Sequence, residues 1–95
     1  MPKLEIEVSR NKIREIVKTG RIDVTRHCRE RMYLRGVEMD DLISLLLSGD
    51  IEPGQEGGDD ESQVFRIIGT DVEEEPLIAV VQIINEQKLL CITVF

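Results

Sequence analysis

Aromatic residues are scarce in this chain, whose 95 residues include no Trp, one Tyr and two Phe. Proteins that bind single-stranded nucleic acid usually stack its bases on aromatic rings, so the composition argues against a broad platform of that kind. The hydrophobic fraction is still 41%, which is enough for a globular fold. We therefore expect one small domain, residues 1–95, with a core made mostly of Ile, Leu and Val.

Cysteine and histidine are also few. Cys28 and Cys91 do not make a disulfide framework, so we expect two reduced thiols and a cytoplasmic protein. His27 is the single histidine, and no further Cys or His pair completes a zinc set, so we predict no metal site. No nucleotide or cofactor motif is present, so we also predict no cofactor. No signal-peptide pattern is visible, and no apolar run approaches the roughly 20 residues that span a bilayer, so we expect no membrane association.

Positive charge is concentrated in the first part of the chain. Residues 1–36 hold ten of the twelve Lys and Arg residues and five acids, a net charge of +5. Residues 37–95 hold two basic residues and fourteen acids, a net charge of −12, and the whole chain carries −7. This asymmetry indicates either a basic face beside an acidic remainder, or two halves that pair electrostatically within one small domain.

Apolar residues at helical spacing predict three helices in the first half of the chain. The clearest is residues 26–35, with Thr25 as its N-cap and Gly36 at its end. Its inward side would carry Cys28 and Met32, with Leu34 as a further candidate. The other two helices are expected at residues 10–19, after Ser9 as N-cap, and at the nearly all-apolar residues 39–48.

Strand-like patterns follow the helices. Residues 21–25 fit a short strand or an extended link, and the strands expected beyond the acidic loop 55–61 are 64–68, 77–84 and 89–95. Their short connections favour an antiparallel meander. The predicted fold is thus α+β, in which a basic helical part (about 1–48) packs on a C-terminal antiparallel sheet of three to four strands (about 50–95). Because strand 77–84 is apolar on both faces, its second face should meet another helix.

A histidine and two arginines recur at intervals of four residues, as His27, Arg31 and Arg35. On a helix such residues are neighbours, with Cβ atoms about 5–6 Å apart. An imidazole that can move a proton near neutral pH, beside guanidinium groups that grip phosphate in a bidentate manner, suits phosphate or RNA chemistry. The same pattern also fits an ordinary solvated basic helix face, with His27 as a spacer near its start.

Three further residues have a functional and a structural interpretation. Tyr33 could stack on a base, but a single Tyr on a helix is more often at the edge of the core. Arg66 could reach a cleft from the middle of its strand, or lie on the solvent side among acids, while its neighbours Phe65 and Ile67 face the other way. Thr93, expected on one face with Cys91 and Phe95, could bind a phosphate or act simply as a β-former.

The order of these motifs resembles that of a known family. Residues 23–37 contain a His-x-x-x-Arg-Met-x-x-Arg-Gly-Val pattern, which Asp41-Leu42-Ile43, Phe65-Arg66-Ile67 and Leu90-Cys91-Ile92-Thr93-Val94 follow in order. Over about residues 20–95 this order is similar to the small bacterial family called domain of unknown function 4258. That family looks related to the RelE, HigB and BrnT-like ribonuclease toxins.

The resemblance implies a RelE-like fold and metal-independent RNA cleavage, in which the ribose 2′-hydroxyl attacks the adjacent phosphate. It implies that Arg31, Arg35 and Arg66 hold the phosphate and the transition state and that His27 is the general acid or base. Thr93 and Tyr33 would be supporting substrate contacts. The implied partners are a cognate antitoxin and RNA or the ribosome. A homodimer stays open beside them, since the sequence does not decide the oligomeric state.

A second function class remains open beside the toxin. Proteins that engage RNA usually carry positive charge because phosphate neutralisation supplies most of the affinity, whereas this chain carries −7. The acidic balance and the shortage of aromatic residues fit a non-catalytic protein-interaction module of the same fold. A gene neighbour that encodes a small antitoxin-like protein would favour the toxin.

Overall fold

The computed structural model describes residues 3–53 and 64–95, and the acidic loop predicted at 55–61 lies outside them. The described part contains three helices and five strands, so the α+β class is confirmed. Their bounds are α1 Lys3–Thr19, β1 Arg21–Val24, α2 Arg26–Arg35, α3 Met39–Ser48, β2 Asp50–Pro53, β3 Val64–Thr70, β4 Pro76–Asn85 and β5 Lys88–Val94. None of the described helices is long and apolar enough to cross a membrane.

The five strands form one mixed sheet in the order β1-β5-β4-β3-β2. Strands β2 to β5 pair antiparallel, whereas β1 pairs parallel with β5, and Val24 lies opposite Cys91. Residues 50–95 thus supply four antiparallel strands, but the predicted sheet of three to four antiparallel strands is incomplete, because β1 adds a fifth strand in parallel pairing. The meander rule holds for β3, β4 and β5, which short turns connect, but β1 reaches its partner only after α2, α3 and three other strands.

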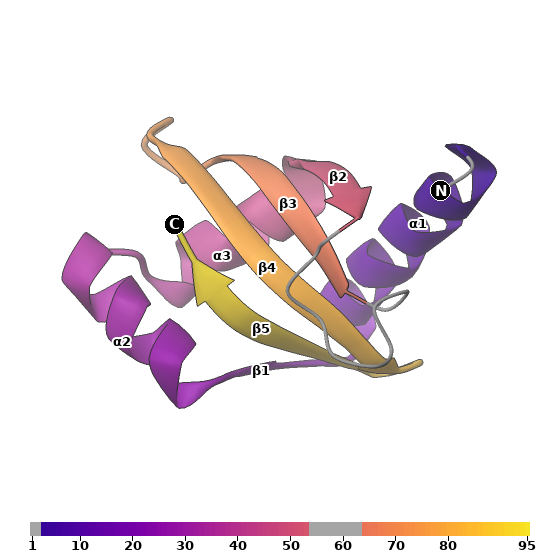
Figure 1. Cartoon of the computed structure of the whole chain (residues 1–95), viewed down its shortest axis with the longest axis horizontal. Coiled ribbons are helices and arrows are strands. Elements are labelled where there is room, and N and C mark those ends of the chain that lie inside the picture. Colours follow the sequence, from indigo (N-terminus) through magenta and orange to yellow (C-terminus); the bar gives the residue numbers. More distant parts are fainter. Residues whose placement is uncertain (1–2, 54–63) are drawn as a thin grey trace.

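One face of the sheet carries the hydrophobic core. Figure 1 shows α1 and α3 on the far side of the sheet and α2 beside the end of β5. All three helices contribute to a single apolar cluster with alternate residues of the strands. Its fully buried members include Ile13 and Ile16 from α1, Cys28 from α2, Leu42 and Leu45 from α3, and Ala79, Val81, Leu89, Cys91 and Val94 from β4 and β5.

The opposite face of the sheet has no helix over it among the described residues. The expectation that a helix covers this side of β4 is wrong for this part of the chain, because α1, α2 and α3 all contribute to the cluster on the other face. Strand pairing and side-chain alternation assign one set of side chains to what we call the helix-free face. Its members include Glu52, Arg66, Ile68, Ile78, Val80, Leu90, Thr93 and Phe95.

The bounds predicted for α2 and α3 are confirmed, but the start predicted for α1 is wrong. Helix α1 begins at Lys3, so Ser9 lies inside it and is not an N-cap. Helix α2 ends as expected because Gly36 adopts a left-handed conformation with φ of 67°. In that conformation its N–H bonds to the carbonyl of Tyr33, and the next N–H, of Val37, bonds to that of Met32.

Candidate functional site

The start of α2 is fixed to β5 by the residue that caps it. The Thr25 hydroxyl accepts a hydrogen bond from the N–H of Cys28 (2.9 Å) and donates one to the carbonyl of Ile92 (2.7 Å). The Thr25 N–H also donates to the carbonyl of Cys91 (3.0 Å). The predicted N-cap is thus confirmed, and the same residue determines where the side chains of α2 lie relative to the end of the sheet.

Arg31 reaches from the middle of α2 to the last residues of β5. Its Nε donates to the carbonyl of Val94 at 3.4 Å, and its guanidinium carbon lies 5.9 Å from the centre of the Phe95 ring. That distance is within the range of a cation–π contact. Arg31 is half-buried and Phe95 is 42% exposed, so the pair is accessible from solvent.

Arg66 approaches the same region from the other side of β4. It lies opposite Val80, which in turn lies opposite Thr93, so the three form a row across the helix-free face. Two strand spacings separate Arg66 from Thr93, a distance of roughly 10 Å between their Cα atoms. Phe95 is two residues beyond Thr93 on the same face, and its main chain is hydrogen-bonded to that of Ile78. The fold therefore brings Arg31, Arg66 and Thr93 to one surface.

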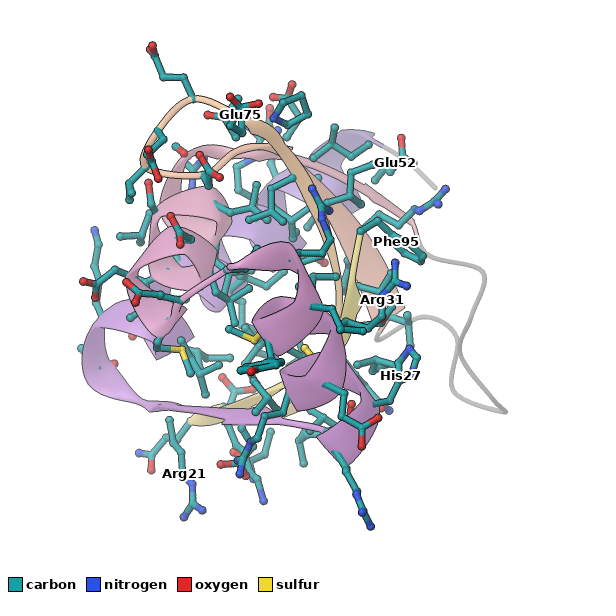
Figure 2. All side chains as sticks on the ribbon, turned by 90° about the vertical axis from the view of Figure 1, so that its left-hand side faces the viewer. Arg21, His27, Arg31, Glu52, Glu75 and Phe95 are labelled. Carbon is teal, nitrogen blue, oxygen red and sulfur yellow. The ribbon has the colours of Figure 1, made fainter. Side chains whose placement is uncertain are left out.

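His27 lies one helical turn before Arg31, with its side chain exposed. Figure 2 shows His27, Arg31, Phe95 and Glu52 following one another along the side of the sheet away from α1 and α3. Glu52 is the ion-pair partner of Arg66, at 3.7 Å. The Nε of Arg66 is buried and has no hydrogen-bond partner among the described residues. We call His27, Arg31, Arg66, Thr93 and Phe95 the candidate site.

The structure does not bring the other two predicted site residues into this group. Arg35, at the exposed end of α2, donates to the carbonyl of Pro76 at 3.3 Å and so ties the helix to the start of β4. Tyr33 is 86% exposed and lies with Arg29, Glu30 and Leu34 around an open hollow on the outer side of α2. Both the core-edge interpretation of Tyr33 and the inward orientation of Leu34, which is 76% exposed, are wrong.

A β-bulge changes the expected orientation of Thr93. Val81 pairs with Cys91 but Val80 pairs with Thr93, so Ile92 is an extra residue in β5. Cys91 consequently points into the core, and Thr93 points with Phe95 to the helix-free face, not with Cys91 as predicted. Thr93 is only 7% exposed, and its hydroxyl lies 3.5 Å from the carbonyl of Val94. Sequence reasoning assigned no role to Phe95, although its two-residue spacing from Thr93 was a usable signal.

Of the three basic side chains of the candidate site, only Arg66 has a carboxylate partner among the described residues, and this partner is Glu52. Within residues 3–53 and 64–95, no carboxylate lies at ion-pair distance from His27, Arg31 or Arg35. The same part of the chain contains no group of three His, Cys, Asp or Glu side chains that could hold a metal ion. The basic and acidic halves of the chain also pair with each other, as the second interpretation of the charge asymmetry expects. Lys12 of α1 lies 2.7 Å from Glu86 of the β4–β5 turn.

A known family matches the part of the chain that contains the candidate site. Residues 24–95 match the family described as a domain of unknown function, DUF4258. The chain belongs to this family. The match to DUF4258 begins at the end of β1 and includes α2, α3 and all four remaining strands, but not α1. No curated protein and no solved structure matches the chain.

Proposed function

We propose that this DUF4258 protein is a toxin-like ribonuclease of RelE-like fold that cleaves RNA without a metal ion. One observation carries the proposal: Arg31 of α2 and Arg66 of β3 face the same surface, with His27 one turn from Arg31. Two guanidinium groups near an accessible imidazole provide the charge stabilisation and the proton transfer that phosphodiester cleavage requires.

In the proposed reaction the 2′-hydroxyl of a ribose attacks the adjacent phosphorus. The proton of that hydroxyl passes to a base, the bond to the 5′-oxygen breaks, and the leaving oxygen gains a proton. The products are a 2′,3′-cyclic phosphate and a 5′-hydroxyl end. Arg31 and Arg66 would bind the phosphate oxygens, which gain negative charge in the transition state, and His27 would exchange the proton. Arg35 lies farther along α2 and would contact a neighbouring phosphate. Thr93 would make a supporting contact with the substrate.

The partner class follows from the same proposal. A ribonuclease of this kind would act on free or ribosome-bound RNA and would be neutralised by a cognate antitoxin. Because the chain carries a net charge of −7, we expect RNA binding to depend on the local positive charge of α2 and to weaken steeply with added salt.

The test is RNA cleavage by the purified chain, with and without a chelator. A chimeric oligonucleotide with a single ribose among deoxyriboses tests the route, because the reaction needs the 2′-hydroxyl next to the broken bond. We expect His27→Ala and Arg31→Ala each to lower the cleavage rate at least about 100-fold, since each removes proton transfer or charge stabilisation. The readout is product yield on a denaturing gel and the mass of the cyclic phosphate.

The matched control is Arg29→Ala, which removes a guanidinium from the opposite side of the same helix. It should cleave RNA at a rate close to that of the unmodified chain. Growth of a bacterial host during induced expression provides a second readout, with arrest expected for the unmodified chain and for Arg29→Ala only. Equal loss in all three variants, or cleavage that needs no 2′-hydroxyl, would refute the site and its chemistry.

A second candidate function, a non-catalytic protein-interaction module, is favoured by a different surface. Tyr33 and Leu34 are large side chains left exposed side by side on the outer side of α2, where an interface would bury them. The module would form a stable complex with a protein encoded nearby and would have no nuclease activity. Tyr33→Ser with Leu34→Ser should weaken such a complex, while His27→Ala with Arg31→Ala should leave it intact.

A further inference from the structure

The two cysteines of the chain meet in the core, although 62 residues separate them in the sequence. Cys28 belongs to α2 and Cys91 to β5, and their Sγ atoms lie 3.3 Å apart. Both residues are fully buried and both are free thiols. In a disulfide the two sulfur atoms lie about 2.05 Å apart, so bond formation would bring them closer by only about 1.3 Å.

The contact between the thiols is held from the main chain on both sides. The N–H of Cys28 donates to the Thr25 hydroxyl, and the carbonyl of Cys91 accepts from the Thr25 N–H. One residue therefore fixes both cysteine backbones, and the parallel pairing of Val24 with Cys91 adds a third constraint. The sulfur atoms face each other in an arrangement that the fold enforces, so little chain entropy has to be lost for them to react with one another.

The environment makes the two thiols unequal. The Cys91 thiol, by hydrogen bonding, lowers the pKa of Cys28, whereas the same contact and burial raise the pKa of Cys91. Because the thiolate is the nucleophile in sulfur chemistry, Cys28 is the residue that reacts first. Cys28 also lies on α2 between the exposed residues His27 and Arg29, so local opening of this helix would give a small oxidant access to it.

We propose that Cys28 and Cys91 are a modification site at which a hydroperoxide forms a reversible intramolecular disulfide. The Cys28 thiolate attacks a peroxide oxygen, the O–O bond breaks, and with hydrogen peroxide one water leaves as Cys28 becomes a sulfenic acid. The Cys91 sulfur then attacks the Cys28 sulfur, the S–O bond breaks, and a second water leaves with the proton of Cys91. Two thiols and one peroxide thus give one disulfide and two water molecules.

The proposal concerns the helix that carries His27 and Arg31, but it does not depend on any nuclease activity. A Cys28–Cys91 bond would join α2 covalently to β5 and close a long loop of the chain. Since such a crosslink restricts the unfolded chain, the oxidised protein should unfold at a higher temperature than the reduced protein. Because the thiols are buried, the reaction should be slow in the folded protein and limited by the opening of α2.

The test is treatment of the whole reduced chain with hydrogen peroxide, followed by intact mass measurement and thiol titration under denaturing conditions. We expect a monomer that is 2 Da lighter, has no titratable thiol, melts at a higher temperature and regains both thiols on treatment with dithiothreitol. Cys91→Ser should instead stop at the sulfenic acid or a higher oxide of Cys28 and show no loss of 2 Da.

Three results with the unmodified chain would overturn the proposal, and none depends on whether a variant folds. They are two thiols that remain titratable after prolonged treatment, a gain of 32 Da without a 2 Da loss, and disulfide bonds found only between two chains. Circular dichroism of the treated chain distinguishes reaction in the folded state from reaction after unfolding. Loss of the folded signal before the thiols disappear would be a fourth result against the proposal.

Discussion

Helices α2 and α3 are both ten residues long, but they are held to the sheet in different ways. Helix α3 packs against β3 and β4 through Leu42, Leu45 and Leu46, which are almost completely buried. Helix α2 buries only Cys28 and Met32. Its other attachments include hydrogen bonds from the side chains of Thr25, Arg31 and Arg35 to carbonyl groups of β5 and β4.

This difference shows which helix is available for function. Most apolar positions of α3 are occupied by the core, so substitutions there should act on folding. Helix α2 needs few buried residues, so its other positions carry exposed side chains of several kinds, among them His27 and Tyr33. We therefore expect substitutions in α3 to change mainly the stability of the fold and substitutions at the exposed positions of α2 to change mainly function.

The largest effect on stability should come from Leu45→Ala in α3. Leu45 is fully buried, and its truncation removes transfer free energy and leaves a cavity, so the free energy of unfolding should fall by about 3 kcal/mol. Met32→Ala in α2 should cost less, about 2 kcal/mol, because Met32 is already 8% exposed. Urea unfolding followed by circular dichroism measures both. A larger loss for Met32→Ala would contradict the distinction between the helices.

The next effect should come from Asp41, a buried carboxylate that fixes the start of α3. It accepts hydrogen bonds from the N–H groups of Glu38 (2.8 Å) and Val72 (3.1 Å), and these bonds lower its pKa below the usual 3.8. The carboxylate therefore stabilises the folded state above about pH 4. This contribution is lost as the pH falls through the lowered pKa, because the protonated group no longer accepts both bonds equally well.

Asp41→Asn should consequently destabilise the chain at neutral pH, and the difference from the unmodified chain should shrink below about pH 4. The measurement is the urea midpoint as a function of pH. Asp40→Asn is the matched control, since Asp40 is exposed in the same helical turn and should show a much smaller, less pH-dependent change. A difference that stays constant down to pH 2 would argue against the carboxylate as the cause.

A smaller effect is expected at Thr25, where the polar attachment of α2 begins. Thr25→Ala removes the cap of the helix and leaves the carbonyl of Ile92 without its donor, at a cost of about 1 kcal/mol. Thr25→Ser keeps the hydroxyl and should recover most of that loss. Because the Thr25 hydroxyl links the Cys28 N–H of α2 to the Ile92 carbonyl of β5, hydrogen exchange should also show α2 opening more often in Thr25→Ala. Unchanged exchange would mean that packing alone holds the helix.

The two helices also show how far local sequence determines structure. Thr25, Gly36 and Gly49 are signals that lie next to the helices they delimit, so both ranges could be predicted to the residue. Ser9 was a weak signal of the same kind, and the helix continues through it. The parallel pairing of β1 with β5 is a contact between distant segments, and nothing within four residues of strand specifies such a partner.

The candidate site shows the same limit. The neighbours His27 and Arg31 follow from helical spacing, but the row from Arg66 to Thr93 depends on the order of strands and on the bulge at Ile92. An extra residue in β5 reverses the face of every residue on one side of the bulge, and no residue type in this stretch predicts where a bulge occurs. Tyr33 lies on the outer side of α2, apart from the candidate site, and helical spacing alone does not tell which side of a helix faces the sheet.

The smallest effect should come from the ion pair on the outer side of α2. Arg26 and Glu30 lie 3.5 Å apart, one turn from each other, with side chains 94% and 64% exposed. Such a pair contributes at most about 0.5 kcal/mol, and a cation in the first turn opposes the helix dipole. Arg26→Ala should thus change the free energy of unfolding by less than about 0.5 kcal/mol, and added salt should reduce even that. A larger loss on urea unfolding would mean that the exposed charges of α2 are needed for folding, and the separation between a helix for the core and a helix for the surface would then fail.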